Sequence, residues 1–166
     1  MPHDTIGWIH TIAAIIALIS GSMILAQAKG TATHKKVGRV YGIAMLVVCA
    51  TSFMIYRVHN SFGVLHFFAV VSTITLALGM LPMYVKGYEN PRLTHLSWMY
   101  WSVIGLYCAF AAEVFTRLPY FLELDNSYGT FYALVGVASG LVGMLGGRYF
   151  RHKKAVWEAQ FGAKHV

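Results

Sequence analysis

The chain has 166 residues, of which 57% are hydrophobic and 11% are charged, and its formal net charge is +7. A soluble domain carries about 25% charged residues, so this chain lacks the polar side chains that coat a water-soluble globule. The composition excludes a disordered chain, a cytosolic enzyme and, despite the positive charge, a nucleic-acid-binding module. It predicts a polytopic membrane protein.

Five apolar stretches are long enough to cross a bilayer, which takes about 20 mostly apolar residues. In chain order they are residues 5–28, 37–56, 62–85, 96–116 and 128–150. The connections are short, so consecutive helices are expected to be antiparallel neighbours. Residues 26–28 resemble a signal-peptidase site, but the N-terminus lacks positive charge and the apolar run is too long, so we expect no cleavage. The sequence therefore predicts an all-α integral membrane bundle of five transmembrane helices, with residues 1–166 in a single domain.

The basic residues predict the orientation of this bundle. With the N-terminus outside, 11 of the 13 Lys and Arg fall on the cytoplasmic side, and only Arg57 and Arg117 fall outside. Cytoplasmic loops of membrane proteins carry such an excess. We expect a cytoplasmic C-terminus and a location in a bacterial cytoplasmic (inner) membrane. The basic C-terminal tail would meet anionic lipid headgroups.

Small residues at helical spacing predict close helix packing, because helices in lipid associate through small side chains. The stretch 128–150 carries Gly136, Gly140, Gly143 and Gly147, and the stretch 37–56 opens with Gly38 and Gly42. We expect these faces to pack closely against other helices of the bundle. The same faces would serve as the contact surface of a homo-oligomer or of a complex with another membrane protein.

Three ionisable residues, His10, His66 and Glu113, lie inside the expected spans. Such residues are costly in hydrocarbon and mark functional sites. At 1.5 Å per residue they lie about 8, 6 and 5 Å below the outer end of the bundle, which predicts one shared site. Each also has a structural explanation. Glu113 can pair with Arg117 one turn later, and either histidine can be a core imidazole bonded to a hydroxyl or carbonyl group.

Several chemistries fit two imidazoles and a carboxylate. A transition metal ion would bind all three residues, whereas two facing imidazoles suit axial ligation of haem b. Arg57 and Arg117 would then hold the haem propionates. The leading hypothesis is haem or metal binding for electron transfer or metal handling.

Two alternatives stay open. A His/Glu cluster open to the outside also relays protons or binds a substrate, as in a small-molecule or proton-coupled transporter or binding protein. The other alternative is a structural assembly partner of a larger membrane complex. The midplane offers mainly Ser and Thr hydroxyls, which argues against conduction of charged solutes.

His34 and His95 are secondary candidates on the cytoplasmic side, where neighbouring basic residues favour contacts with lipid headgroups or loops. The chain also resembles a family of bacterial membrane proteins catalogued as a domain of unknown function (DUF2306). The resemblance is carried by Ile9-His10, Ala17-Leu18, Gly21, Lys29-Gly30, His34-Lys35, Gly38-Arg39, Ala44-Met45-Leu46, His95, Met99, Ser102, Gly105-Leu106, Ala109 and Glu113. It departs from the family pattern at Ala14 and Trp101. The resemblance implies that His10, His34, His95 and Glu113 matter, and it implies no activity.

Overall fold

The computed structural model describes residues 5–55, 62–122 and 128–161, and these residues contain no strand. They form α1 (Thr5–Ala26), α2 (Ala32–Ser52), α3 (Val64–Met80), the short 3-10 helix η1 (Leu81–Met83), α4 (Pro91–Leu122) and α5 (Tyr128–Phe161). The predicted all-α architecture is confirmed.

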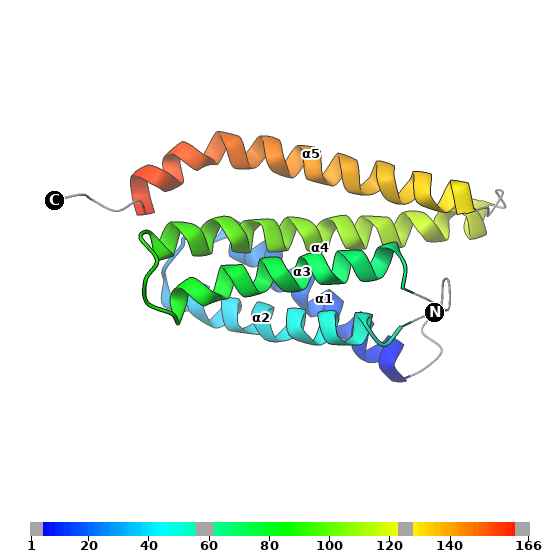
Figure 1. The fold of residues 1–166 in the computed structure, drawn as a ribbon, viewed down its shortest axis with the longest axis horizontal. Helices are drawn as coiled ribbons and strands as arrows, with labels where there is room; N and C mark the ends of the chain where they lie inside the picture. The colour runs from blue at the N-terminus through cyan, green and yellow to red at the C-terminus, as the bar shows by residue number, and fades with distance from the viewer. Residues whose placement is uncertain (1–4, 56–61, 123–127, 162–166) are drawn as a thin grey trace.

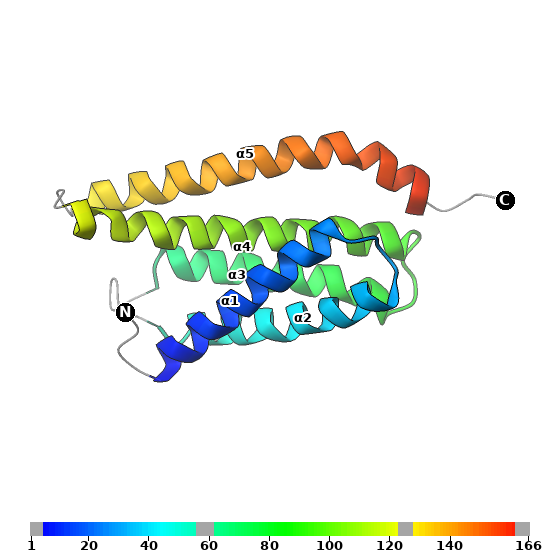
Figure 2. The same ribbon diagram turned by 180° about the vertical axis from the view of Figure 1, so that it is seen from behind.

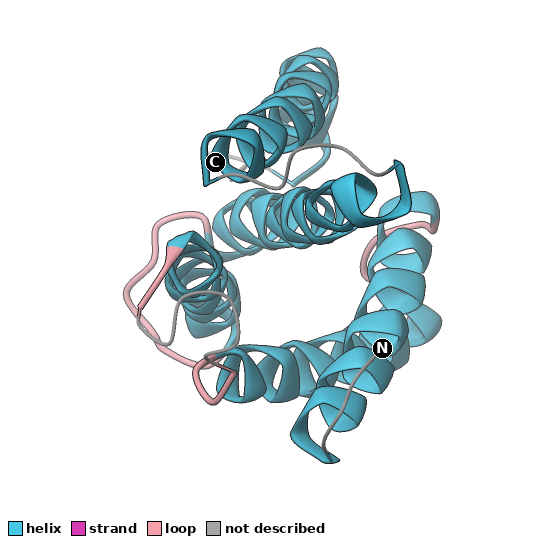
Figure 3. Ribbon diagram, turned by 90° about the vertical axis from the view of Figure 1, so that its right-hand side faces the viewer, coloured by secondary structure: helices cyan, strands magenta, loops and turns pink. Residues whose placement is uncertain are grey.

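Helices α1 to α4 form a ring, and α5 lies outside it along α4 (Figures 1 and 3). Each helix packs on the one before it and runs in the opposite direction, as the short connections predict. The ring closes because α1, which lies obliquely in Figure 2, also contacts α4. In the described part of the chain, no backbone contact links α1 with α3. These two helices therefore face each other diagonally.

Tyr41 of α2 fills the centre of the ring and is fully buried. Its hydroxyl lies 2.9 Å from the hydroxyl of Ser102 on α4, which is also fully buried. Gly21 of α1 makes room for the ring of Tyr41, because a Cβ at this position would lie 3.1 Å from Cε2 of the tyrosine. Tyr41 thus reaches from α2 across the ring to α4, and it belongs to a core cluster with buried residues of all four ring helices, such as Ala17, Leu76 and Val103.

The outer surface of the bundle is apolar. Large side chains that stay exposed on different helices include Ile12, Ile19, Ile43, Met144 and Leu145. Monomeric soluble proteins rarely expose such continuous apolar surface, whereas lipid accommodates it. Four helical segments are also long and apolar enough to cross a membrane: 5–26, 64–83, 91–115 and 129–161. The chain is a multi-pass membrane protein.

Helix α2 differs from the expected second span. It begins at Ala32 and ends at Ser52, whereas the sequence suggested residues 37–56. The part beyond Lys36 is about 16 residues, or about 24 Å, which is shorter than a hydrocarbon core of about 30 Å. Its first turns carry Lys35, Lys36 and Arg39, and these charges exclude α2 from the helices that are apolar enough to cross a membrane. The described residues thus contain four qualifying helices rather than five.

Three other helices also end or begin at residues that differ from expectation. Helix α3 ends at Met80 rather than residue 85, because the chain tightens into η1 around Pro82, which lacks the N–H that an α-helix needs. Helix α4 covers Pro91–Leu122 instead of 96–116. Helix α5 continues past residue 150 to Phe161, and Trp157 of this extension packs on Tyr100, with ring centroids 5.6 Å apart.

The glycine stripes make only part of the expected contacts inside the chain. A Cβ added at Gly136, Gly140, Gly143 or Gly38 would meet nothing within 4 Å in the described structure, so the expectation of close packing within the bundle is wrong for these four positions. Gly42 is buried, and a Cβ at Gly147 would lie 3.7 Å from Trp101. The tightest contact between α4 and α5 is at Gly146, where a Cβ would lie 2.8 Å from Ile104. Contacts with another copy or another protein stay a prediction.

Candidate functional site

The structure joins His10 of α1 to Thr51 of α2. The Nδ1 atom of His10 lies 2.9 Å from Oγ1 of Thr51, and this hydroxyl lies 2.7 Å from the carbonyl oxygen of Val47. A hydroxyl has one proton and a carbonyl only accepts, so Thr51 donates to Val47 and His10 donates through Nδ1–H to Thr51. The arrangement favours the Nδ1–H tautomer and leaves the lone pair on Nε2.

Glu113 of α4 belongs to the same neighbourhood. Its carboxylate is an electrostatic neighbour of the His10 ring. Both side chains are half-buried. These residues come from three helices, and we call His10, Thr51 and Glu113 the His10 cluster. The shared site of His10 and Glu113 stays a prediction.

His66 has a structural role of its own at the start of α3. Its Nδ1 accepts the backbone N–H of Gly63 at 3.2 Å, and its buried ring packs against Phe62 with centroids 5.2 Å apart. These contacts cap the helix and occupy the Nδ1 lone pair. The spacing of Gly63 and His66, at the N-cap and N3 positions, is a local signal that the sequence analysis did not use. His66 also lies on the helix diagonal to that of His10.

The expected ligands of a metal or haem are only partly described. Arg57 lies outside the described residues, and so does the side chain of Arg117 in α4. Within the described ranges, no group of three or more His, Cys, Asp or Glu side chains is placed to hold a metal ion. The structure thus adds no support to the haem and metal hypotheses, which stay predictions.

Hydroxyl groups line the interior of the ring. The hydropathy of the sequence does not predict which hydroxyl groups lie there. The buried ones are Ser20, Thr51, Ser72, Thr75 and Ser102. Most of them bond to their own helix, as Ser20 does to the carbonyl of Ile16 at 2.6 Å. These bonds satisfy the hydroxyl protons within the helices. The sequence argument against conduction of charged solutes stays a prediction.

A second polar group lies at the other end of the bundle. Lys29 donates to the carbonyls of Leu25 and Gln27 at 3.0 and 3.1 Å, which caps the C-terminal end of α1. Nδ1 of His95 hydrogen-bonds the carbonyl of Gly79 at 2.6 Å. Burial lowers the pKa of Lys29, and burial together with the charges of Lys29 and His95 lowers the pKa of His34. The two secondary histidine candidates are therefore electrostatically coupled to each other.

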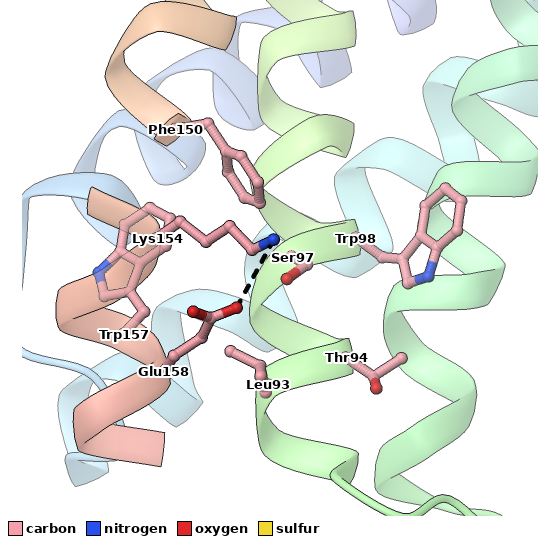
Figure 4. A pocket seen from close by; sticks show the side chains of 8 residues that line it. All are labelled: Leu93, Thr94, Ser97, Trp98, Phe150, Lys154, Trp157 and Glu158. Carbon is pink, nitrogen blue, oxygen red and sulfur yellow. Dashed lines mark ion pairs between the residues drawn. The ribbon is translucent and has the colours of Figure 1, made fainter. Parts of the chain in front are cut away.

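Two clefts flank the helical extension of α5 at this end. One, of about 270 Å³, lies between α4 and α5, and we call it the α4–α5 cleft. Figure 4 shows Lys154 and Glu158 extending from α5 toward α4, where their charged groups lie 3.6 Å apart. The other, of about 250 Å³, lies between residues 25–29 and α5, and we call it the Lys29 cleft. Neither cleft follows from the hydropathy pattern, because the apolar stretch ends at residue 150 whereas the helix continues to Phe161.

Comparisons with protein-family models, with curated proteins and with solved structures found no match for this chain. The resemblance to the family of unknown function stays a prediction.

Proposed function

We propose that the chain is a proton-coupled transporter or binding protein for a small molecule, and that the His10 cluster carries the proton. The proposal rests on one observation: the His10 imidazole is bonded to Thr51 and lies in the field of the Glu113 carboxylate inside a membrane bundle. Imidazole and carboxylate groups placed inside membrane proteins mark proton relays and substrate pathways. Histidine is also the side chain that changes charge nearest to neutral pH.

The hydrogen bonds define how the cluster would work. Thr51 accepts the Nδ1 proton, so Nε2 of His10 is the atom that takes up and releases a proton. The imidazolium that forms is balanced by Glu113, which keeps the net charge inside the bundle near zero. The cluster therefore offers one exchangeable proton at a defined atom.

The same proposal includes the finer topology: five spans, an outside N-terminus and a bacterial cytoplasmic membrane. The distribution of basic residues supports this orientation. Helix α2 lies alongside α1 and α3 (Figure 1) and exposes Val40, Ile43 and Leu46 as a lipid-facing helix would. These features support α2 as the fifth span, with the His10 cluster in the outer half.

The test of this proposal measures the protonation state of the His10 ring. Chains labelled with 15N-histidine and placed in lipid nanodiscs give the protonation state of each His10 ring nitrogen by NMR. We expect the ring to change its protonation state within the range of the titration, pH 4 to pH 9, and we expect Glu113→Gln to move the midpoint. The control is Thr11→Val, which removes a neighbouring hydroxyl that bonds only to its own helix at Gly7. A ring that holds one protonation state from pH 4 to pH 9 rules the proposal out.

The haem or metal hypothesis is tested on the same preparation. An absorbance spectrum with a Soret band that disappears in His10→Ala would favour haem, and a stoichiometric metal in elemental analysis would favour a metal ion. Either result replaces the proton-coupled function proposed above. Co-purification with a larger complex that tolerates His10→Ala would favour the structural role.

A further inference from the structure

The Lys29 cleft is a polar hollow at the end of an apolar bundle, on the side away from the His10 cluster. Leu25 at the end of α1 and the residues 27–29 that follow it form one wall, and the last turns of α5 form the other. Lys29 and Lys153 face it from these two walls, beside the apolar Leu25, Val156 and Trp157. Among the described residues that line it, none is acidic. The cleft thus combines positive charge with apolar surface.

The polar groups of this cleft are suited to an anion with several acceptor oxygens. The ammonium of Lys153 lies 5.9 Å from the ring centroid of Tyr149, another residue of the cleft wall. Lys29 directs its N–H groups to the carbonyls of Ile24, Leu25 and Gln27, so it supplies charge rather than a hydrogen bond. Gln27, also in the wall, has a buried amide nitrogen without a hydrogen-bond partner among the described residues.

An apolar track leads out of the cleft along α5. Leu145, Tyr149, Lys153 and Val156 follow one another at intervals of four or three residues, so they lie on one face of the helix. Leu145, Tyr149 and Val156 are exposed, and Leu145 lies within the apolar segment 129–161. An amphiphile with its charged group in the cleft would therefore lay its hydrocarbon on a surface that already faces lipid.

We propose that the Lys29 cleft binds an anionic glycerophospholipid, with the phosphate beside Lys153 and Gln27 and the acyl chains along Tyr149 and Leu145. A zwitterionic lipid of the same acyl chains offers the same hydrocarbon but no net charge. The two lysines therefore make the site selective for the anionic headgroup.

The α4–α5 cleft supplies an internal control. Lys154 is the next residue after Lys153 but lines this other cleft, where Glu158 lies 3.6 Å from its ammonium. Lys153→Gln and Lys154→Gln therefore remove the same charge from neighbouring positions of one helix and affect different clefts. General attraction between the basic helix and anionic lipid responds equally to both changes.

The experiment is native mass spectrometry of the delipidated full chain. Phosphatidylglycerol and phosphatidylcholine of identical acyl composition are titrated separately, and glycerol 3-phosphate forms a third arm. We expect phosphatidylglycerol to bind at least about fivefold more tightly than phosphatidylcholine, and Lys153→Gln to weaken it by about fivefold. Lys154→Gln should change it less than about twofold.

Two outcomes overturn the proposal: equal binding of the two lipids, or equal losses in Lys153→Gln and Lys154→Gln. Binding of glycerol 3-phosphate as tight as that of phosphatidylglycerol also overturns it, because the site would then recognise a free phosphate. None of these measurements depends on the His10 cluster, so the proposal stands or fails separately from the proton-coupled function.

Discussion

The hydroxyl of Tyr41 on α2 and that of Ser102 on α4 lie 2.9 Å apart in the centre of the ring, and both residues are fully buried. The two helices belong to opposite sides of the ring and make no backbone contact with each other in the described chain. This hydrogen bond therefore links two helices across the diagonal, between segments whose backbones do not touch.

Tyr41→Phe should destabilise the bundle by about 1 kcal/mol, because it leaves the Ser102 hydroxyl without its interhelical partner. The measurement is reversible unfolding in mixed micelles, followed by circular dichroism. Ser102→Ala should cost about the same, and the double variant should cost less than the sum of the two. Fully additive losses would show that the two hydroxyls do not act on each other.

Gly146→Ala should destabilise the contact between α4 and α5. The added Cβ would lie 2.8 Å from Cγ2 of Ile104, and overpacking of this kind costs about 1–3 kcal/mol. Gly143→Ala, one turn earlier on the same helix, is the matched control, since its Cβ meets nothing within 4 Å. That variant should be neutral or slightly stabilising, because alanine favours a helix by up to about 1 kcal/mol. Equal unfolding midpoints for the two variants would contradict the packing of α5 on α4.

Thr51→Val should change the tautomer of His10. With its hydroxyl acceptor removed, the Nδ1–H form loses its favoured bond and the two neutral tautomers approach equal populations. The 15N chemical shifts of the ring nitrogens at high pH report these populations. Ser52→Ala is the control, because Ser52 bonds to the carbonyl of Val48 in its own helix. A wild-type ring that is already an even mixture would show that Thr51 does not orient it.

The free energy of unfolding should fall as the pH drops below about 6.5. Burial, followed by the charges of Lys29 and His95, lowers the pKa of His34 from its ordinary value of 6.5. Below pH 6.5 the unfolded chain therefore binds a proton at His34 that the folded chain does not yet bind, and acid favours unfolding. His34→Gln should remove this part of the pH dependence, measured by denaturation between pH 5 and 8. His152→Gln, which removes an exposed imidazole from α5, is the comparison variant.

The sequence by itself determined the membrane class and the helical architecture. A helix in lipid must satisfy its backbone hydrogen bonds within one continuous apolar segment, so this information is local in the chain. The positions of four spanning helices follow from it, and so does the antiparallel order imposed by short connections. Two helix ends were less well predicted. Residues 151–161 are polar but remain helical, and α2 begins before its apolar stretch, so that its first turns contain charged residues.

Only the tertiary structure decided which polar side chains meet. His10 and Thr51 are 41 residues apart in the chain, and depth in the membrane alone did not single out Thr51 from other hydroxyls. Depth also grouped His66 with His10, but the ring places α1 and α3 on a diagonal and gives His66 a capping role at Gly63. The order of helices around the ring depends on side-chain packing between distant segments. Hydropathy measures how favourably each segment enters lipid, so it contains no information on how the segments pack against one another.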